Sequence, residues 1–228
     1  MMEALFRDQD AGSGRRLVAP GAVHLPGWLS LAQQQFLVRQ FEDWSSGPVP
    51  IRAARLPGGR QMSVRMVCLG WHWQPYRYTR EAADVNAARV LELPEWLGDL
   101  GRQALAKAYE DPGAAEAYRP DVALVNFYDD AATMGMHQDR DERSDAPVVS
   151  FSVGDTCRFR FGNTETRTGP YTDVELVSGD AFVFGGPSRF AYHGVPRIFP
   201  GSADPRCGLR SGRINLTLRV TGLPRSPS

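Results

Sequence analysis

Three side chains in the second half of the chain have the chemistry of a metal site. His137 and Asp139 lie in the run HQDRDE (137–142) and are one residue apart, so an extended backbone would direct both side chains to the same face. His193 follows much later, in the apolar run FAYHGV. Two imidazoles and one carboxylate form the facial triad that binds non-haem iron(II) and leaves coordination positions open. The H-x-D pair alone is equally compatible with ordinary polar residues on the surface.

The end of the chain adds a second pattern, SGRINLTLRV (Ser211–Val220). Its alternation predicts a strand whose two faces differ. One face carries Arg213, Asn215, Thr217 and Arg219, and the other carries Ile214, Leu216, Leu218 and Val220. Arginines that face the interior need buried anions, and a dicarboxylate co-substrate would supply them. An edge strand with one solvated face would show the same alternation.

Together these patterns resemble the AlkB family of iron(II)- and 2-oxoglutarate-dependent dealkylating dioxygenases. The resemblance covers most of the chain, and its motifs follow the order of the family. They are MSVRM (62–66), LGW (69–71), YRY (76–78), NFY (126–128), HQDRDE (137–142), SRFAYHG (188–194) and RINLTLR (213–219). The stretch between Trp71 and Tyr76 is shorter than the family pattern, so the pocket wall is where departures from the family are expected.

The fold that this resemblance implies is α+β and mainly β. Its core is a double-stranded β-helix, or jelly roll, and N-terminal helices and a nucleotide-recognition segment pack on that core. The sequence favours helices over 30–44 and 93–110, the first with a capping box at Ser30 and Gln33. Strands are predicted at Val122–Tyr128, Val148–Val153, Cys157–Phe161, Asp173–Leu176, Ala181–Phe184, Phe190–Val195 and Ser211–Val220.

The length and composition suit one soluble domain. The chain has 228 residues, of which 42% are hydrophobic, and we predict one dioxygenase domain over 1–228. Within it, 1–115 would form the N-terminal extension and recognition lid, and 116–222 the jelly-roll core. Three widely spaced cysteines without a CxxC motif, no signal sequence and no membrane-length apolar run indicate a cytoplasmic protein. The termini, 8–14 and 224–228, look loosely structured.

A basic and aromatic stretch, the recognition segment (49–80), indicates the kind of substrate. The net charge of the chain is zero, so a nucleic-acid partner would have to bind a local patch. The segment contains no acidic residue, and it interleaves arginines with rings: Arg52, Arg55, Arg60, Arg65, Arg77 and Arg80 with Trp71, Trp73, Tyr76 and Tyr78. Arginines suit phosphates and rings suit stacked bases. A solvated loop with a few buried aromatics would have the same composition.

The resemblance also implies roles for individual residues. His137, Asp139 and His193 would hold Fe(II). The residues expected to bind 2-oxoglutarate are Asn126, Tyr128, Arg213, Asn215 and Arg219. Guanidinium groups supply bidentate, charge-assisted hydrogen bonds to a carboxylate, and the amides and the phenol can satisfy its other lone pairs. With O₂ these components would give succinate and CO₂ and hydroxylate an N-alkyl carbon, after which the base and an aldehyde separate.

The expected substrate-binding residues are Met66, Trp71, Tyr76, Asp141 and Arg167. A base that reaches such a pocket must leave its stack, and Trp71 and His137 resemble the pair that encloses it in the family. Met66 would equally suit ordinary core packing. Asp141 lies two residues after Asp139 and would attract a cationic base, unless it forms a salt bridge with Arg140 or Arg143 and only stiffens its loop.

The function predicted from these features is oxidative demethylation of 1-methyladenine and 3-methylcytosine in DNA, by a monomer that acts on single strands. One alternative is an oxygenase of the same type whose substrate is RNA or a small molecule. Another is a non-catalytic jelly roll that only binds metal, although such a module would not need the paired arginines of RINLTLR.

Overall fold

The structure is a computed structural model, and it describes residues 14–224. The predicted loose termini, 8–14 and 224–228, therefore lie almost wholly outside the described residues. Fourteen strands and three α-helices make up this part of the chain. None of these helices is long and apolar enough to cross a membrane.

The larger sheet has eight strands in the order β1-β2-β12-β9-β14-β7-β4-β3. Their bounds are β1 Arg16–Ala19, β2 Ala22–Leu25, β12 Ala181–Phe184, β9 Val148–Gly154, β14 Arg213–Arg219, β7 Val122–Tyr128, β4 Gln61–Leu69 and β3 Arg52–Arg55. All of its pairings are antiparallel. The strands near the middle, β9, β14 and β7, come from distant parts of the chain, so this sheet brings the predicted co-substrate residues together.

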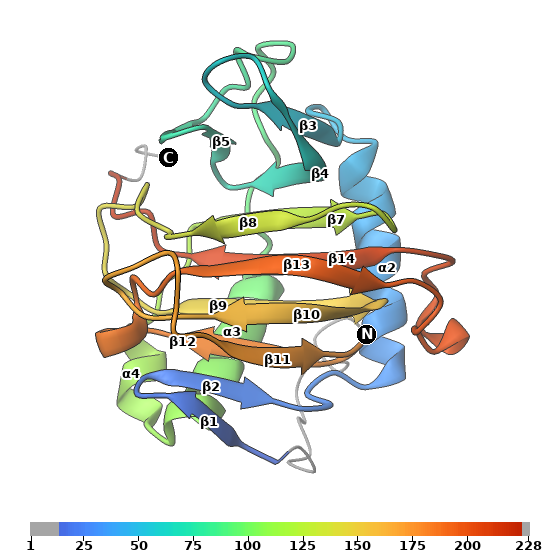
Figure 1. Ribbon diagram of the computed structural model, residues 1–228. Helices are drawn as coiled ribbons and strands as arrows, with labels where there is room; N and C mark the ends of the chain where they lie inside the picture. Colours follow the sequence, from blue (N-terminus) through green and yellow to red (C-terminus); the bar gives the residue numbers. More distant parts are fainter. Residues whose placement is uncertain (1–13, 225–228) are drawn as a thin grey trace.

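A second sheet faces the first, in the order β11-β10-β13-β8. Its strands are β11 Thr172–Leu176, β10 Thr156–Phe161, β13 His193–Phe199 and β8 Met134–His137. Phe161 of this sheet packs against Phe182 and Phe184 of the larger one, with ring centroids 5.4 and 5.6 Å apart. The two facing antiparallel sheets form the predicted jelly roll (Figure 1).

The outer face of the larger sheet is covered by helices α2 (Leu31–Ser45) and α3 (Glu95–Tyr109) (Figure 1). α2 begins with the predicted capping box, because Gln33 donates its backbone N–H to the Ser30 hydroxyl and accepts the Ser30 N–H with its side chain. α3 ends where Glu110 adopts a left-handed backbone with φ 54°. A short helix, α4 (Pro112–Ala117), follows, and the side chain of Asp111 caps its first turn.

The alternating residues of β14 give this strand one face toward the helices and one face, the site face, toward the second sheet. Ile214, Leu216 and Leu218 are fully buried in the core beneath the helices. The polar residues of β14 point to the space between the two sheets, because alternate residues of a strand face opposite ways. β14 lies between β9 and β7, which excludes the edge-strand interpretation of its pattern.

One predicted strand has wrong bounds, and some strands were not predicted. The strand expected at Phe190–Val195 begins only at His193 and runs to Phe199, since residues 186–192 form a 3₁₀ turn (Gly186–Ser188) and a loop. β8 and the edge pair β1 and β2 were not predicted. All three are four residues long, and β8 reads MGMH, too short to show an alternation.

The recognition segment forms two hairpins, one at the edge of the larger sheet and one separate from it. β3 and β4 are joined by a turn at Gly58 and Gly59, both of which have positive φ. β5 (His72–Gln74) and β6 (Arg77–Thr79) form a separate two-stranded sheet, turning at Pro75 and Tyr76. Figure 1 shows both hairpins gathered at one end of the molecule, above β8.

The capping box at α2 provides a test of the fold. Replacing Ser30 with Ala removes the acceptor for the Gln33 N–H, and we expect the free energy of unfolding to fall by about 1 kcal/mol. Ser30→Asp restores an acceptor and should recover most of this loss. Urea denaturation followed by circular dichroism measures both, and equal stability of the Ala variant and the parent would contradict the assignment.

Candidate metal and co-substrate site

His137, Asp139 and His193 converge between the two sheets. His137 ends β8 and His193 begins β13, and the two residues are direct cross-strand partners. Asp139 follows β8 and is buried, with one carboxylate oxygen 3.5 Å from His137 Nε2 and the other 3.6 Å from His193 Nε2. The donor atoms of all three residues lie within 4.8 Å of one another. Two neighbouring strands and the loop between β8 and β9 thus assemble the metal-ligand set.

Each histidine is oriented by a backbone carbonyl. His137 Nδ1 donates to the Gly135 carbonyl at 2.9 Å, and His193 Nδ1 donates to the Ala191 carbonyl at 3.0 Å. A carbonyl only accepts, so the proton is on Nδ1 and the lone pair on Nε2 is available to a metal. Burial lowers the pKa of His193 to about 4, although Asp139 opposes the shift, so this imidazole is neutral at pH 7. The sequence had given no indication of these partners.

Arg219 is the closest positive charge to Asp139. Its guanidinium lies 2.9 Å from Asp139 Oδ1, and both groups are buried. Burial alone would raise the pKa of Asp139, but Arg219 and His193 outweigh burial and hold that pKa well below its usual range. The carboxylate therefore stays ionised, as a metal ligand must. The buried anion that the sequence required for Arg219 is thus provided in part by the protein itself.

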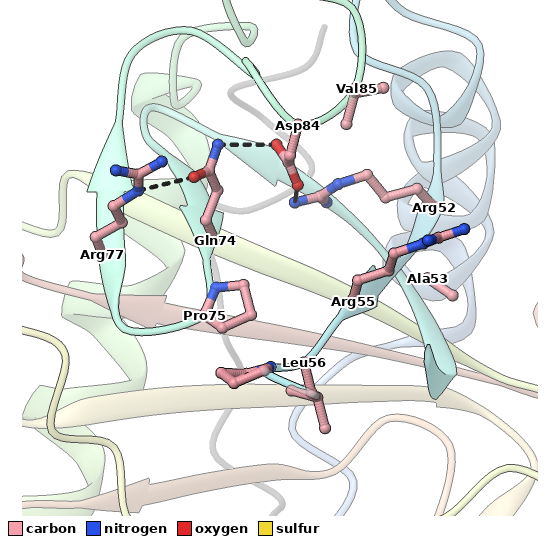
Figure 2. Close-up of a pocket in the computed structure, with 10 residues that line it drawn as sticks. Arg52, Ala53, Arg55, Leu56, Gln74, Pro75, Arg77, Asp84 and Val85 are labelled. Atoms are coloured by element: carbon pink, nitrogen blue, oxygen red, sulfur yellow. Dashed lines mark hydrogen bonds and ion pairs between the residues drawn. The ribbon is translucent and has the colours of Figure 1, made fainter. Parts of the chain in front are cut away.

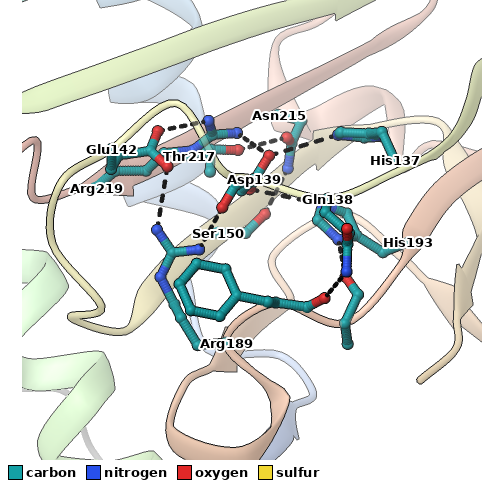
Figure 3. A network of polar contacts seen from close by, with 12 residues as sticks. His137, Gln138, Asp139, Glu142, Ser150, Arg189, His193, Asn215, Thr217 and Arg219 are labelled. Atoms are coloured by element: carbon teal, nitrogen blue, oxygen red, sulfur yellow. Dashed lines mark hydrogen bonds and ion pairs between the residues drawn. The ribbon is translucent and has the colours of Figure 1, made fainter. Parts of the chain in front are cut away.

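Glu142 extends this pair into a buried network that the sequence did not predict (Figure 3). Its Oε1 accepts from Arg219 at 3.0 Å and from the Tyr78 hydroxyl at 2.5 Å, and its Oε2 accepts from Arg189 at 3.1 Å. Two carboxylates and two guanidinium groups thus lie in one buried cluster. Glu142 and Arg189 belong to the motifs HQDRDE and SRFAYHG, but only their three-dimensional contacts distinguish them from surface charges.

Arg189 links the two parts of the chain that carry the metal ligands. We call residues 138–147, between β8 and β9, the metal loop. The single guanidinium of Arg189 donates to the Asp139 carbonyl at 2.8 Å, the Ala146 carbonyl at 2.8 Å and the Glu142 carboxylate. Arg189 itself lies four residues before His193 and is 1% exposed. It therefore fixes the path of the metal loop relative to the start of β13.

The predicted 2-oxoglutarate residues form neighbouring rows on the site face of the larger sheet. Asn126 of β7 pairs with Asn215 of β14, and Tyr128 pairs with Arg213. Asn215 donates to the Ser150 hydroxyl at 2.6 Å and accepts from Thr217 at 2.9 Å. Cross-strand partners share a face of the sheet, so these groups line one surface beside Asp139 and Arg219.

Several buried polar atoms on this surface lack a partner in the described part of the chain. They are Arg213 Nε, Arg219 Nε, Asn126 Oδ1 and Asp139 Oδ2. Arg213 is the clearest case: it is 1% exposed, and its other nitrogens reach only backbone carbonyls and the Ser152 hydroxyl, at 2.6 Å for the latter. A buried guanidinium without a carboxylate is costly. The residues present therefore suit an anionic ligand at Arg213 and a cation at Asp139.

The predicted substrate residues are more scattered. Met66 and Trp71 belong to one apolar cluster and are 2% and 8% exposed. Met66 pairs with Asn126 across β4 and β7 and so shares the site face, yet its burial agrees with core packing. The indole of Trp71 donates to Asp121 at 3.2 Å, and the Arg80 guanidinium lies 3.8 Å from its ring centroid. One face of Trp71 is thus covered by Arg80.

Tyr76, Arg167 and Asp141 lie in loops. Tyr76 is 72% exposed at the β5–β6 turn and has φ 73°. Arg167 is exposed, and its guanidinium lies 5.7 Å from the Tyr192 ring. Asp141 lies in the metal loop and accepts a hydrogen bond from the indole of Trp73 at 2.8 Å. Within the described residues it forms no salt bridge with Arg140 or Arg143, the alternative considered for it. Trp73 itself was not predicted as a site residue.

Comparison with known proteins agrees with this geometry. The model of the 2OG-Fe(II) oxygenase superfamily matches residues 21–219. An alpha-ketoglutarate-dependent dioxygenase AlkB homolog of Caulobacter vibrioides is 39% identical, with 95% of this chain and 97% of that protein covered. The AlkB dioxygenase of Escherichia coli is 36% identical over 93% of this chain and 96% of its own length. The chain belongs to the AlkB family of 2-oxoglutarate- and iron(II)-dependent dioxygenases.

Other members of the family are also similar. The DNA N(6)-methyladenine demethylase ALKBH1D of Arabidopsis thaliana is 32% identical over 92% of this chain, and the chain spans 51% of that longer protein. The solved structure of OsALKBH1 superposes with a TM-score of 0.80 at 32% identity, covering 90% of this chain and all of that one. The jelly-roll fold is therefore that of the family.

Membership of this AlkB family means that the chain is an enzyme that uses Fe(II), 2-oxoglutarate and O₂. The triad offers two imidazole nitrogens and one ionised carboxylate, a donor set that suits iron(II). The unpartnered guanidinium of Arg213 suits the carboxylate of a keto acid.

Replacing His193 with Ala should abolish succinate formation and sharply weaken iron binding, because one of three ligands is lost. The imidazole packs against Phe184, with centroids 5.0 Å apart, so some loss of stability is also expected. Iron affinity is measured by titration of the metal-free protein, and circular dichroism checks the fold. Iron affinity equal to that of the parent would remove His193 from the ligand set.

Replacing Arg219 with Lys keeps the charge but loses the planar fork that reaches both Asp139 and Glu142. Loss of a buried charged hydrogen bond costs roughly 1.5–3 kcal/mol, so we expect the affinity for 2-oxoglutarate to fall about ten- to a hundredfold. Isothermal titration with 2-oxoglutarate and Mn(II) measures this without turnover. An unchanged affinity would show that Arg219 serves only the internal network.

Proposed function

We propose that this dioxygenase removes alkyl groups from N-alkylated bases in DNA, with 1-methyladenine and 3-methylcytosine as its main substrates. The observation that carries the proposal is the site itself: a His-Asp-His set beside a buried arginine that has no carboxylate partner. Family members named for DNA or nucleic acid support the choice of substrate. They include the Arabidopsis demethylase and the nucleic acid dioxygenase ALKBH1 of human, which is 31% identical over 67% of this chain.

The recognition segment supports a nucleic-acid strand as the partner. A pocket of about 770 Å³ lies between β3 and the β5–β6 hairpin, and Arg52, Arg55 and Arg77 contribute to its walls (Figure 2). Arg55 and Arg77 are exposed, and no carboxylate pairs with either in the described chain. Positive charge on an exposed pocket wall suits the phosphates of a nucleic-acid strand.

Arg52 has a different role from its neighbours. Its guanidinium donates to the Trp73 carbonyl at 2.6 Å and lies 3.6 Å from Asp84. It is mostly buried and is already paired, so it holds the hairpin in place. Arg55 and Arg77 are therefore the better candidates for phosphate contacts.

The residues of the site have different proposed roles in the reaction. When bound, Fe(II), 2-oxoglutarate and O₂ supply the oxidising power that hydroxylates the alkyl carbon, and 2-oxoglutarate leaves as succinate and CO₂. Arg213 and Arg219 would hold the keto acid, while Asn126 and Asn215 orient it. His137, Asp139 and His193 would hold the iron, and the facing sheets shield the site from water. Asp141 would accept a hydrogen bond from the exocyclic amino group of a cationic base.

RNA is the second candidate substrate, because an arginine-rich and aromatic surface accepts either nucleic acid. A small-molecule substrate would leave the exposed arginines without a role. A non-catalytic binding module would not need a buried arginine to bind a keto acid, as proposed for Arg213. We further propose that the enzyme acts on single strands as a cytoplasmic monomer. Its proposed domain spans 1–228, with the extension and lid in 1–115 and the catalytic core in 116–222.

The decisive experiment is succinate release with Fe(II), ascorbate and 2-oxoglutarate. We expect release to be stimulated by oligonucleotides that contain 3-methylcytosine or 1-methyladenine, and the repaired base is confirmed by mass spectrometry. Matched DNA and RNA oligonucleotides, single- and double-stranded, rank the substrates. If no methylated nucleic acid stimulates release, the proposed function is wrong.

The exposed arginines provide a second test. Replacing Arg55 and Arg77 together with Gln should weaken oligonucleotide binding and flatten its salt dependence, because up to two phosphate contacts are lost. A free methylated nucleoside should be affected much less. The control variant, Arg16→Gln with Arg39→Gln, removes the same charge from exposed sites on β1 and α2. Equal losses in both double variants would mean that only net charge matters.

A further inference from the structure

Trp73 connects the recognition segment to the metal loop. It is the central residue of β5, and its indole N–H donates to Asp141 Oδ2 at 2.8 Å, across 68 positions of sequence. Asp141 lies two residues after Asp139. The cross-strand partner of Trp73 is Tyr78, whose hydroxyl donates to Glu142. Two neighbouring side chains on one face of the hairpin thus bind two consecutive carboxylates of the metal loop.

The other face of β5 is anchored independently. His72 Nε2 lies 2.6 Å from Asp84 Oδ1, and Gln74 donates to the same oxygen at 2.9 Å. Figure 2 shows Gln74 between Asp84 and Arg77, and Arg52 beside Asp84. His72 is fully buried and Gln74 is 6% exposed. The position of Trp73 is therefore set by its own strand, and its bond to Asp141 is not needed to hold β5.

Trp73 also differs from Trp71, the tryptophan that the sequence indicated. Trp71 is 8% exposed, its indole nitrogen serves Asp121, and Arg80 covers one ring face. Trp73 is only partly buried, and its N–H reaches the metal loop. Of these two rings, Trp73 is the one in direct contact with a residue expected to select the substrate.

The two oxygens of a carboxylate can accept hydrogen bonds from different partners. The group rotates easily about its terminal torsion unless a hydrogen bond restrains it. The indole N–H occupies Oδ2 of Asp141 and so limits rotation of the group. No protein hydrogen bond to the other oxygen, Oδ1, is formed within the described residues. Such an oxygen can accept the exocyclic amino group of a cationic base, while a base with a carbonyl at that edge would meet acceptor against acceptor.

We propose that Trp73 is a specificity-determining residue that acts by orienting Asp141 toward the amino group of cationic lesions. This rests on the proposed function and adds to it the residue that sets the choice among lesions. Trp73 is a positioning residue in this respect, since its hydrogen bond is made to Asp141 and not to the reacting carbon.

Replacing Trp73 with Phe tests the proposal, because it removes the N–H donor and keeps an aromatic ring, although a smaller one. We expect the ratio of kcat/KM for 3-methylcytosine over 3-methylthymine oligonucleotides to narrow by about tenfold, the size of one charged hydrogen bond. The loss should appear mainly in KM for the cationic lesion. The ratio of the affinities for the two oligonucleotides, measured with Mn(II) by fluorescence anisotropy, should fall in the same way. This measurement does not depend on turnover.

Two further variants separate orientation from loosening of the hairpin. Asp84→Asn weakens the anchors of β5 but leaves the indole donor, so it should change the rates on both lesions by the same factor. In a double-mutant cycle, adding Trp73→Phe to Asp141→Asn should change the kcat/KM ratio for the two lesions little further if the two residues act together. Independent, multiplying effects on the lesion ratio would overturn the proposal.

The outcomes distinguish this proposal from the function on which it rests. If the parent enzyme prefers cationic lesions and Trp73→Phe keeps the full preference, the role of Trp73 is wrong and the proposed function stands. If the parent enzyme repairs neither lesion, the proposed function and the role of Trp73 are both wrong. If Asp84→Asn narrows the ratio as much as Trp73→Phe, general loosening of the hairpin explains the effect and the proposal fails.

Discussion

The structure depends most on the buried charge cluster of Asp139, Glu142, Arg189 and Arg219. Removing ionised groups from water costs several kcal/mol for each ion, and that cost is offset only when hydrogen bonds and opposite charges meet them. Here each carboxylate meets a guanidinium within 3.1 Å. Loss of one partner would leave an uncompensated buried charge, which typically costs 3–5 kcal/mol. The geometry of the metal loop is therefore tied to the stability of the cluster.

This cluster also explains why the two arginines proposed to bind the co-substrate differ. Arg219 has two protein carboxylates as partners, whereas Arg213 has only neutral ones. Arg219 thus helps to hold Asp139, the proposed metal ligand, before any ligand binds. The charge of Arg213 is not compensated by protein carboxylates in the described residues. A dicarboxylate that binds here would gain most electrostatic stabilisation at Arg213. At Arg219 it must share the guanidinium with Asp139 and Glu142.

The sequence predicted those parts of the fold in which one strand or helix carries its own pattern. The alternation of Ser211–Val220 identified both faces of β14, and the capping box located the start of α2. Shorter elements escaped prediction, since four residues of β8 cannot show a period. The strand at His193 begins three residues later than expected because Arg189 and its neighbours turn to reach the metal loop. Contacts between distant segments, such as Trp73 with Asp141, have no local pattern that could reveal them.

The shortened stretch after Trp71 shows how a local departure changes a site. The β5–β6 hairpin turns at Pro75 and Tyr76, with Tyr76 in a left-handed conformation that is uncommon for a tyrosine. This tight turn leaves three residues in each strand and places Trp73 opposite Tyr78. An insertion or deletion of one residue in β5 would reverse the faces of its side chains, because the period of a strand is two. The indole would then point toward Asp84, and the bond to Asp141 would be lost. The length of the hairpin is thus part of what determines which group meets the metal loop.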